Sequence, residues 1–547
     1  MKRFLCVWLM LFVLCGCAWA EESRDSTGLY RLAENGEAIV DDVAFYGDGQ
    51  PRDNCRVFYE IFVGSFSDSD GDGVGDLRGV INRMDYLNDG DPESGLSLGV
   101  EGLWLTPIFA SPTYHKYDVT DFYAIDPAFG TMDDLRELIA LCHERNVMLI
   151  LDLPINHTGV QNRWFKNFLN AHLMHNPNNA YYDFYVWRAD GDALPAGRHF
   201  VRAQNAGVLY EANFSDSMPE PDFDQPFVRQ TLLDVALYYL EMGVDGFRFD
   251  AAKYIYLGDN ARSADFWQWY IGELKRVKPD LYTVAEVWDG DGVIEQYIPM
   301  TNCFNFSASQ ADGIIAATAK AGNANRFTAY IESYLNRIHA LNGDAMSILF
   351  VSNHDMDRAA GYLTAASGRM KMAANLYLLS PGSPFIYYGE EIGLRGSRGG
   401  SNSDANRRLA MLWGDGDPIA DPPEATYDRA KQTPYSVQDL LGMETGLYNY
   451  YKRLIMIRKA NPEIARGEYK ALSFTDTKMG GFLCAWEGST VAVLHNPSGS
   501  SQTVDLSAAT DLPFTVISAV IGDGGAYLDG TVLKLDGQTS VVLRTGE

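Results

Sequence analysis

The sequence predicts an α/β protein: a (β/α)8 TIM barrel with an insertion domain after its third strand and a C-terminal antiparallel β-sandwich. From residue 57 onward, short and almost continuously apolar runs alternate with amphipathic helical segments, as in a parallel sheet covered on both faces. These apolar runs number eight, which is the number that such a barrel requires. After residue 465 the pattern changes to short alternating runs divided by Gly, Ser and Asp, which is typical of antiparallel strands.

The eight barrel strands are expected at the apolar runs 57–63, 102–106, 147–153, 243–250, 281–288, 303–306, 346–352 and 384–388. Helices are expected between them, among others at 77–88, 131–145, 227–242 and 445–459. In the second of these helices, Leu135, Leu138, Ile139 and Cys142 recur at i, i+3, i+4 and i+7, the spacing that places them on one helix face.

The domain organisation follows from where this alternation stops. Residues 158–226 separate the third strand from its helix, and a connection of that length is normally functional or a small domain of its own. The barrel is therefore expected at 55–157 and 227–465, the insertion domain at 158–226, and the sandwich at 466–547, with strands at 481–486, 490–494, 502–506 and 540–543. Residues 21–54 are polar with little periodicity and are interpreted as a tether.

Residues 1–20 are interpreted as a targeting segment, with Lys2 and Arg3 ahead of an apolar run at 4–14 that is too short to span a bilayer. Two cleavage sites remain open. Ala18-Trp-Ala20 suits ordinary signal peptidase, whereas residues 14–17 resemble a bacterial lipobox with Cys17 as the lipidated residue, which the polar segment after it favours. The prediction is an extracytoplasmic protein of the bacterial cell envelope, attached to the membrane only through a lipid anchor, or periplasmic or secreted if cleaved after Ala20.

Charge and cysteine content exclude several classes of protein. The net charge of −28 argues against nucleic-acid binding, which needs a basic surface. Beyond the targeting segment, Cys55, Cys142, Cys303 and Cys484 are widely spaced in apolar surroundings, which is neither a disulfide framework nor a zinc-binding spacing. They are expected to be buried free thiols.

Four predicted strands end in charged or polar residues. The ends contain Asp152 with His157, Arg248 with Asp250, Glu286, and His354 with Asp355. Any one of these could be a structural ion pair or a cap. In a barrel of this kind the carboxyl ends of the strands meet on one rim, where active sites lie. Four such ends together favour a catalytic site, because buried carboxylates without partners are costly.

These motifs carry a resemblance to a known family. Asp152-Leu-Pro-Ile-Asn-His157, Gly246-Phe-Arg-Phe-Asp-Ala-Ala-Lys253, Glu286-Val-Trp288 and Ser352-Asn-His-Asp355, in this order and spacing, resemble the α-amylase family of glycoside hydrolases. The resemblance extends from about residue 57 to the C-terminus, with further matching segments at 114–123, 126–130 and 382–391. Met218-Pro-Glu-Pro-Asp222 partly resembles the signature of a group that includes bacterial lipoprotein α-amylases, intermediate between oligo-1,6-glucosidases and neopullulanases.

The resemblance implies a role for each matching residue. Asp250 would be the nucleophile of a retaining reaction and Glu286 the general acid/base, with their carboxyls roughly 5–5.5 Å apart. Asp355 would stabilise the transition state. Substrate binding would fall to a further set, in which Arg248 keeps the nucleophile charged and Tyr117 stacks on the sugar ring: Tyr117, Asp118, His157, Arg248, Lys253 and His354. Asp152 is interpreted as structural.

A separate acidic loop predicts a calcium site. Asp68, Asp70, Asp72 and Asp76 occupy positions 1, 3, 5 and 9 of an EF-hand-like loop, with the Val74 carbonyl at position 7, but position 12 lacks its Glu. The alternative is an acidic, glycine-rich turn. Related enzymes bind calcium after the first strand, so Ca²⁺ is predicted here, held by these four carboxylates and the Val74 carbonyl. A second calcium near Asn156 is left open, because Tyr254 replaces a usual His.

The predicted function is that of a monomeric α-amylase that cleaves α-1,4 bonds in starch-type glucans or maltooligosaccharides with retention. Ala251 and Lys253 resemble the residues of α-1,4-acting members. A 4-α-glucanotransferase, or an α-glucosidase or neopullulanase of the same family, is the alternative among enzymes, since catalytic residues are shared. A catalytically inactive glycan-binding surface lipoprotein is the alternative from another class. It is less favoured because all three carboxylates are present.

Overall fold

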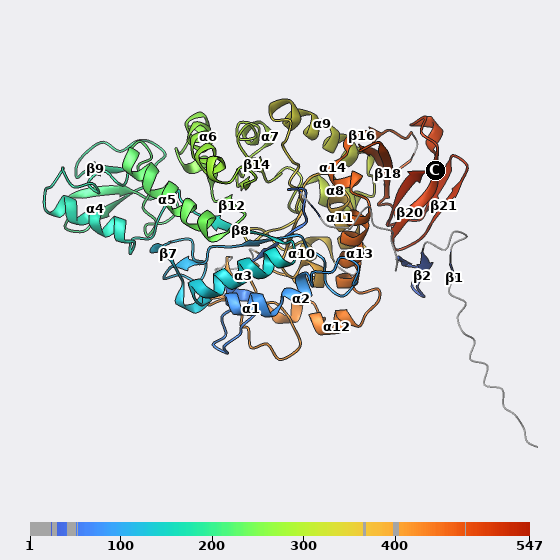
Figure 1. The fold of residues 1–547 in the computed structure, drawn as a ribbon, viewed down its shortest axis with the longest axis horizontal. Coiled ribbons are helices and arrows are strands. Elements are labelled where there is room, and N and C mark those ends of the chain that lie inside the picture. The colour runs from blue at the N-terminus through green and yellow to red at the C-terminus, as the bar shows by residue number, and fades with distance from the viewer. Residues whose placement is uncertain are drawn as a thin grey trace, which may run out of the picture.

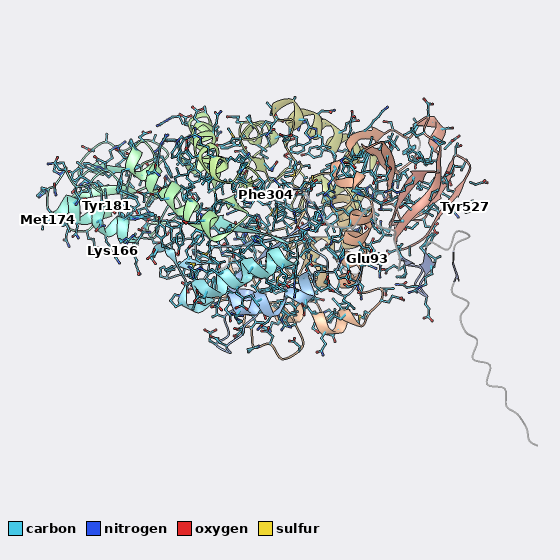
Figure 2. The ribbon with its side chains drawn as sticks, viewed as in Figure 1. Glu93, Lys166, Met174, Tyr181, Phe304 and Tyr527 are labelled. Atoms are coloured by element: carbon cyan, nitrogen blue, oxygen red, sulfur yellow. The ribbon has the colours of Figure 1, made fainter. Side chains whose placement is uncertain are left out.

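The computed structural model describes residues 23–24, 30–40, 51, 53–364, 368–397, 404–475 and 477–546. The predicted targeting segment, with Cys17, lies outside these residues, as does much of the predicted tether. The molecule is elongated, with the barrel between the insertion at one end and the C-terminal sheets at the other (Figure 1). Figure 2 shows Met174 and Tyr181 at the insertion end, Tyr527 at the opposite end and Phe304 between them.

The barrel is built from a parallel sheet of seven strands in the order β14-β13-β12-β8-β5-β4-β15. The strands are β4 (Phe58–Ile61), β5 (Gly102–Leu105), β8 (Met148–Leu153), β12 (Gly246–Phe249), β13 (Tyr282–Ala285), β14 (Asn302–Cys303) and β15 (Phe385–Tyr387). Almost every residue in these strands is buried, as expected for a parallel sheet covered on both faces. The predicted barrel is confirmed.

The seventh predicted strand, 346–352, is not a regular strand, although it occupies the expected place. Ile348 forms a single parallel bridge with Phe304, a pairing too short to count as a strand. The Asn305 N–H donates to the Ile348 carbonyl at 3.0 Å, and the Phe385 N–H donates to the Leu349 carbonyl at 2.9 Å. This segment therefore connects β14 to β15 and closes the barrel.

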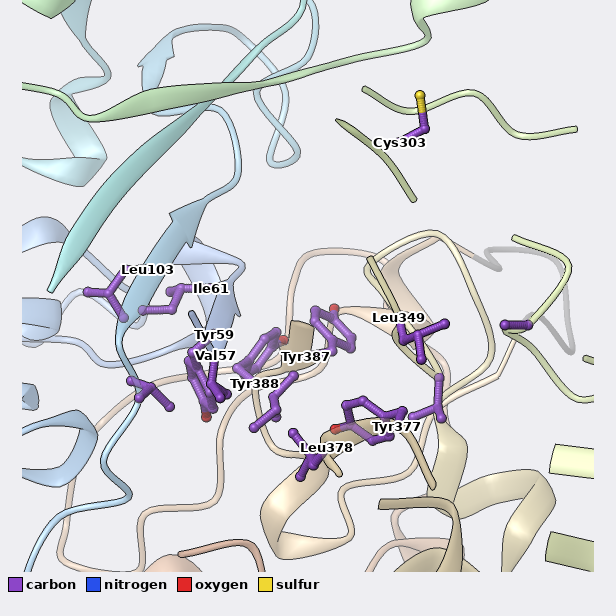
Figure 3. Close-up of a cluster of buried hydrophobic side chains, with 14 of the residues drawn as sticks. Val57, Tyr59, Ile61, Leu103, Cys303, Leu349, Tyr377, Leu378, Tyr387 and Tyr388 are labelled. Atoms are coloured by element: carbon purple, nitrogen blue, oxygen red, sulfur yellow. The ribbon is translucent and has the colours of Figure 1, made fainter. Parts of the chain in front are cut away.

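The strands have two buried faces with different partners. Phe58 of β4 and Trp104 of β5 point into the barrel, where a separate apolar cluster includes Phe304 and Phe385. Alternate residues point outward to the helices, as the two-residue period of a strand requires. Figure 3 shows part of the outer layer, in which Tyr59 and Ile61 of β4 belong to the same cluster as Tyr377 and Leu378. The inner cluster fills the barrel beneath the rim.

Helices surround the sheet, and the predicted helix at 77–88 is divided in two. Arg83 interrupts it with a non-helical backbone, φ −101° and ψ 7°. The Arg83 side chain reaches Asp415 and Asp417 instead. The helices around the barrel are α1 (Leu77–Asn82), α2 (Met84–Leu87), α3 (Met132–Glu144), α5 (Pro226–Met242), α6 (Asn260–Val277), α7 (Asp291–Ile294), α8 (Ile314–Ala321), α9 (Asn325–Leu341), α10 (Ala359–Leu363), α11 (Arg369–Leu378), α12 (Val437–Leu441), α13 (Leu447–Ala460) and α14 (Glu463–Arg466).

Helix α3 shows why the sequence pattern predicted a helix correctly. Thr131 caps its first turn through a reciprocal pair of hydrogen bonds with Asp134, which satisfies free backbone N–H groups. The four residues that share one face in the prediction, Leu135, Leu138, Ile139 and Cys142, are all buried. Local capping and burial of one apolar face thus favour the same helix.

The insertion between β8 and α5 has a small sheet and one main helix. Strands β9 (Trp187–Ala189), β10 (Phe200–Ala203) and β11 (Val208–Glu211) pair antiparallel in the order β10-β11-β9, beside α4 (Arg163–Leu173). Buried aromatic side chains hold it together, including Trp164, Phe165, Phe168, Phe184 and Tyr185. Before it, the hairpin of β6 (Phe109–Ala110) and β7 (Asp121–Ile125) carries the connecting residues 111–120.

The C-terminal region is antiparallel, as predicted. One sheet has the order β1-β2-β3-β20-β23-β18-β17-β16, and a second has the order β19-β22-β21. Their C-terminal strands are β16 (Glu468–Leu472), β17 (Gly480–Trp486), β18 (Ser489–Asn496), β19 (Gln502–Asp505), β20 (Phe514–Gly522), β21 (Ala526–Asp529), β22 (Val532–Leu535) and β23 (Thr539–Thr545).

The interpretation of residues 21–54 as a polar tether is wrong for residues 30–40. These residues form β2 (Arg31–Leu32) and β3 (Ala38–Ile39), which extend the C-terminal sheet after β1 (Ser23–Arg24), with Ala38 paired to Gly522. Glu37 is buried and forms ion pairs with Lys371 and Arg453 on two barrel helices. The hairpin was missed because two-residue strands leave no periodic pattern, and its ion-pair partners lie more than 300 residues away.

Two further expectations concern the membrane and the cysteines. Among the residues with a described structure, no helix is both long and apolar enough to cross a bilayer. Cys142, Cys303 and Cys484 are buried and free, and Cys55 is free and partly buried. The prediction of unpaired structural thiols agrees with these positions.

Candidate active site

The carboxyl ends of β8, β12 and β13 lie side by side and bring the predicted charged residues together. Arg248 on β12 is in register with Asp152 on β8 and with Val284 on β13. Asp250 and Glu286 follow directly after β12 and β13, so both reach the same rim. There they border a cleft of about 620 Å³, lined by Thr113, His115, Tyr117, His157, Phe214, Ser215, Ser217, Met218, Asp250, Ala251, Lys253, Tyr254, Glu286, Trp288, Asp355, Asp404 and Arg408.

One buried guanidinium group, that of Arg248, holds three carboxylates. Its Nη1 donates to Asp250 Oδ1 at 2.7 Å and to both carboxylate oxygens of Asp152, at 2.8 and 2.9 Å. Its Nη2 donates to Glu286 Oε2 at 2.8 Å. The Arg248 side chain is fully buried, so little water screens these interactions. The sequence predicted the pairing with Asp250, whereas the structure shows a four-residue cluster.

Glu286 differs from the other carboxylates in its protonation. Burial is the main reason that the pKa of Glu286 rises to about 7, and the carboxylates of Asp250 and Asp355 add to it while Arg248 opposes it. The Ala251 N–H also donates to Glu286 Oε2, at 2.9 Å. Ala251 has a left-handed backbone with φ 42°, an uncommon conformation for a residue other than Gly, at the turn that follows Asp250. Glu286 can therefore carry a proton near neutral pH.

The Asp355 carboxylate lies between two cationic side chains, those of His354 and Arg408. Its Oδ2 is 2.9 Å from His354 Nε2, and its Oδ1 accepts from Arg408 Nη2 at 2.8 Å. Burial raises the pKa of Asp355, but His354 and Arg408 outweigh it and hold that pKa well below its usual range. For His354 the directions are reversed: burial lowers the pKa of the imidazole, but the carboxylates of Asp355 and Glu60 outweigh burial and raise that pKa to about 9. The pair is thus an ionised carboxylate beside a charged imidazole.

The predicted substrate-binding residues divide into two groups. Tyr117, His157 and Lys253 line the cleft. Tyr117 donates from its hydroxyl to Asp152 Oδ2 at 2.9 Å, and its ring stacks on the His354 ring at a centroid distance of 5.6 Å. His157 Nε2 is 3.1 Å from the Tyr117 carbonyl, and Lys253 Nζ donates to the Trp288 carbonyl at 2.8 Å.

Asp118, Arg248 and His354 do not line the cleft. Arg248 and His354 are fully buried and contact the carboxylates of Asp250 and Asp355. Asp118 is also buried, and its carboxylate accepts from Ser111 Oγ at 2.6 Å and from Thr113. It therefore supports the 111–118 segment, and the substrate-binding role predicted for these three residues stays a prediction.

Two buried charged residues at the site were missed. Glu60, in the middle of β4, lies 2.5 Å from His354 Nδ1, and Arg408 lines the cleft beside Asp355. Each is about 50 to 300 residues away from its partner in sequence. A charged residue inside the apolar run at 57–63 was the available signal for Glu60. Nothing local distinguishes Arg408 from other arginines.

The acidic loop after β4 forms a smaller carboxylate cluster than predicted. Asp68, Asp70 and Asp76 each offer an oxygen, and these three atoms lie within 4.8 Å of one another. Asp72 does not belong to this cluster, and its Oδ1 accepts from the Val74 N–H at 2.7 Å. Asp68 and Asp76 are buried, which is unfavourable for clustered carboxylates without a cation. Oxygen ligands of this kind suit a hard ion such as Ca²⁺.

Comparisons with known proteins agree with this geometry. Residues 60–467 match the family model for the alpha amylase catalytic domain. Alpha-amylase 3 of Dictyoglomus thermophilum is 34% identical over 460 residues, which cover 82% of this chain and 86% of that protein. A 4-alpha-glucanotransferase of Thermotoga neapolitana is 33% identical over 347 residues, which cover 62% of this chain and 72% of that protein.

A solved structure shows the same architecture. Amy13B of Eubacterium rectale superposes with a TM-score of 0.82 at 32% sequence identity, covering 92% of this chain and 97% of that one. The family match spans most of the chain, and the superposition covers nearly all of it. This chain belongs to the α-amylase family of glycoside hydrolases.

Proposed function

We propose that the protein is an α-amylase that hydrolyses α-1,4 bonds in starch-type glucans or maltooligosaccharides with retention of configuration. The observation that supports this most strongly is the pairing of Asp250 and Glu286 on one guanidinium group at the rim of a cleft. One carboxylate can attack while the other supplies a proton, which is what retaining hydrolysis requires.

In the first step, an oxygen of Asp250 bonds to the anomeric carbon as the glycosidic C–O bond breaks, and the Glu286 proton passes to the leaving oxygen. Arg248 and Ala251 both donate to Glu286 Oε2, which favours the proton on Oε1. In the second step, Glu286 takes a proton from water, whose oxygen bonds to the anomeric carbon and releases Asp250. Asp355 stabilises the positive charge that develops on the sugar in both steps.

Product analysis separates hydrolysis from transfer. With maltoheptaose as substrate, we expect only oligosaccharides shorter than the substrate at early times, with the new reducing ends in the α-configuration by NMR. Products longer than maltoheptaose from the outset would support a 4-α-glucanotransferase instead, the activity that names one relative. A folded protein without turnover on any α-glucan would support the inactive glycan-binding alternative.

The pH dependence follows from the proton that Glu286 must hold in the first step. Because the pKa of Glu286 is raised to about 7, kcat/KM is expected to fall about tenfold per pH unit above that value. The measurement is kcat/KM on a soluble maltooligosaccharide from pH 5 to 10. A profile that stays level to pH 9 would contradict the role of Glu286 as the acid.

We also propose that Asp68, Asp70 and Asp76 bind Ca²⁺. Removing the ion with EDTA is expected to lower the melting temperature by at least about 2 °C, because an ion that binds only the folded state stabilises it. The same change is expected for Asp68→Asn in the presence of calcium. Asp72→Asn is the matched control, since Asp72 lies outside the carboxylate cluster. An EDTA-insensitive melting temperature, or equal effects of both variants, would contradict the site.

The cellular location rests on the sequence. We propose a monomer held at the bacterial cell envelope by acylation of Cys17, which the lipobox-like residues 14–17 support. The mass of the mature N-terminal peptide distinguishes acylated Cys17 from cleavage after Ala20.

A further inference from the structure

Glu60 is a buried carboxylate beneath the active site that does not line the cleft. We infer that Glu60 is a positioning residue for the reaction: it keeps the His354 imidazole doubly protonated, so that His354 forms an ion pair with Asp355. This inference deepens the proposed function and rests on it for its effect on turnover. The protonation state of His354 itself can be tested without a substrate.

The hydrogen bonds around the His354 ring require a proton on each nitrogen. Nδ1 lies 2.5 Å from Glu60 Oε1, a carboxylate oxygen that can only accept a hydrogen bond, so the hydrogen belongs to Nδ1. Nε2 lies 2.9 Å from Asp355 Oδ2 and 2.6 Å from the Tyr117 hydroxyl oxygen. The Tyr117 hydroxyl donates its own hydrogen to Asp152, so its oxygen accepts from Nε2. A neutral ring protonated on Nδ1 would place the Nε2 lone pair against both oxygens.

The charged groups around His354 favour the same state. Glu60 reaches it from β4, Asp355 from the His354 segment itself, and Tyr117 from the 111–120 connection, with Asp152 one hydrogen bond further on. Arg408 approaches the backbone carbonyl of His354 rather than the ring, with Nε at 3.0 Å. The uncharged Trp104 ring of β5 packs edge-to-face with the His354 ring, with 5.6 Å between the ring centroids. Two carboxylates thus contact one imidazole, and Glu60 is the one that cannot touch a ligand in the cleft.

The backbone at His354 and Asp355 has its own supports. Arg408 donates to the His354 carbonyl, and Arg407 donates to the Asp355 carbonyl. Glu60 adds one bond to this set, from the His354 N–H at 3.2 Å, which a glutamine oxygen can also accept. Replacing the Glu60 carboxylate with an amide therefore changes the charge beside His354 more than the path of the chain.

The functional consequence reaches Asp355. If His354 becomes neutral, Asp355 loses one of its two charged donors and faces a lone pair at Nε2. The Asp355 carboxylate then loses a contact that holds it in the orientation needed to stabilise the transition state. The expected loss is in kcat, because Asp355 acts on charge that develops during the reaction.

Glu60→Gln tests this through the pH profile. In the wild-type enzyme we expect log kcat/KM to fall with slope −1 above pH 7 and to steepen near pH 9, where His354 loses its proton. In Glu60→Gln the steepening is expected to move down by about one pH unit, so that activity falls to about one fifth of the wild-type value at pH 9 but changes little at pH 7, with most of the loss in kcat.

The matched control is Glu391→Gln. Glu391 is equally buried and accepts hydrogen bonds from Tyr59 and Tyr86, but it does not contact His354. It is expected to keep the wild-type profile. If Glu60→Gln loses activity with an unchanged profile, or if both variants shift alike, Glu60 has only a structural role and the inference is overturned. Unchanged activity and profile in Glu60→Gln overturn it as well.

A second measurement needs neither a variant at Glu60 nor any activity. In ¹⁵N NMR spectra of the wild-type protein, with the His354 signals assigned by their loss in His354→Gln, both ring nitrogens are expected to remain protonated at pH 7.5. A neutral His354 ring at that pH overturns the inference even if the protein is an amylase. A charged ring in a protein without glucan turnover would leave the protonation argument intact and overturn the proposed function instead.

Discussion

Asp250→Asn is expected to reduce turnover by roughly 10⁴-fold or more, because an amide oxygen cannot form the covalent intermediate that Asp250 would provide. The fold should persist. Asparagine has the same shape, and its Oδ1 can still accept from Arg248 Nη1, which keeps its other two carboxylate partners. Single-turnover and steady-state assays on maltoheptaose, with circular dichroism and thermal unfolding for the fold, provide the measurement.

Asp280→Asn is the matched control for this substitution. Asp280 also makes an ion pair, with Lys278, but its side chain is 74% exposed and does not line the cleft. Its activity is expected to equal that of the wild type. Turnover by Asp250→Asn within tenfold of the wild type would remove Asp250 from the role of nucleophile.

Arg248→Met is expected to abolish activity and to destabilise the protein by about 3–5 kcal/mol, since breaking a buried ion pair leaves its partner charge uncompensated. Three carboxylates, those of Asp152, Asp250 and Glu286, would lose their common cation in a site with little water. Methionine has a similar length and no charge, so loss of packing volume contributes little. The measurement is the denaturant midpoint of unfolding followed by near-UV circular dichroism.

Two further variants show whether charge is the cause. Arg136→Met removes an exposed ion pair with Asp133 and is expected to change stability by less than about 1 kcal/mol. Adding Asp152→Asn to Arg248→Met removes one of the stranded charges, and is expected to recover part of the stability but none of the activity. If the double variant is less stable than Arg248→Met alone, uncompensated charge is not the source of the loss.

The arrangement of the fold was largely predictable from local patterns. The spacing of residues such as Leu135 and Cys142 predicts which face of a helix is buried, and the continuous apolar runs predict strands that are buried on both faces. The failures occurred where the pattern was too short or had no local cause. Two-residue strands at 30–40 carry no period, and the seventh apolar run, 346–352, has the composition of a strand but forms one bridge with Phe304.

The candidate site was predictable where its residues lie at the carboxyl ends of predicted strands. Asp250, Glu286 and Asp355 each occur at the end of an apolar run and within motifs of several residues, so sequence alone placed them on one rim. The substrate-binding roles of Asp118 and His354 stay predictions: both side chains are buried, and a motif records which residues occur together and not which of them faces the cleft. The acidic motif likewise did not show that Asp72 lies outside the carboxylate cluster.

The sequence by itself determined the order of the strands, the family and the identity of the three carboxylates, because each depends on residues close together in the chain. Only the tertiary structure decided which charges meet. Arg248 joins ends of three strands, Glu60 contacts His354 across 294 residues, and Arg408 contacts Asp355 across 53. The protonation of Glu286 and His354 depends on burial and on these distant partners, and barrel closure, not local sequence, brings them within hydrogen-bonding distance.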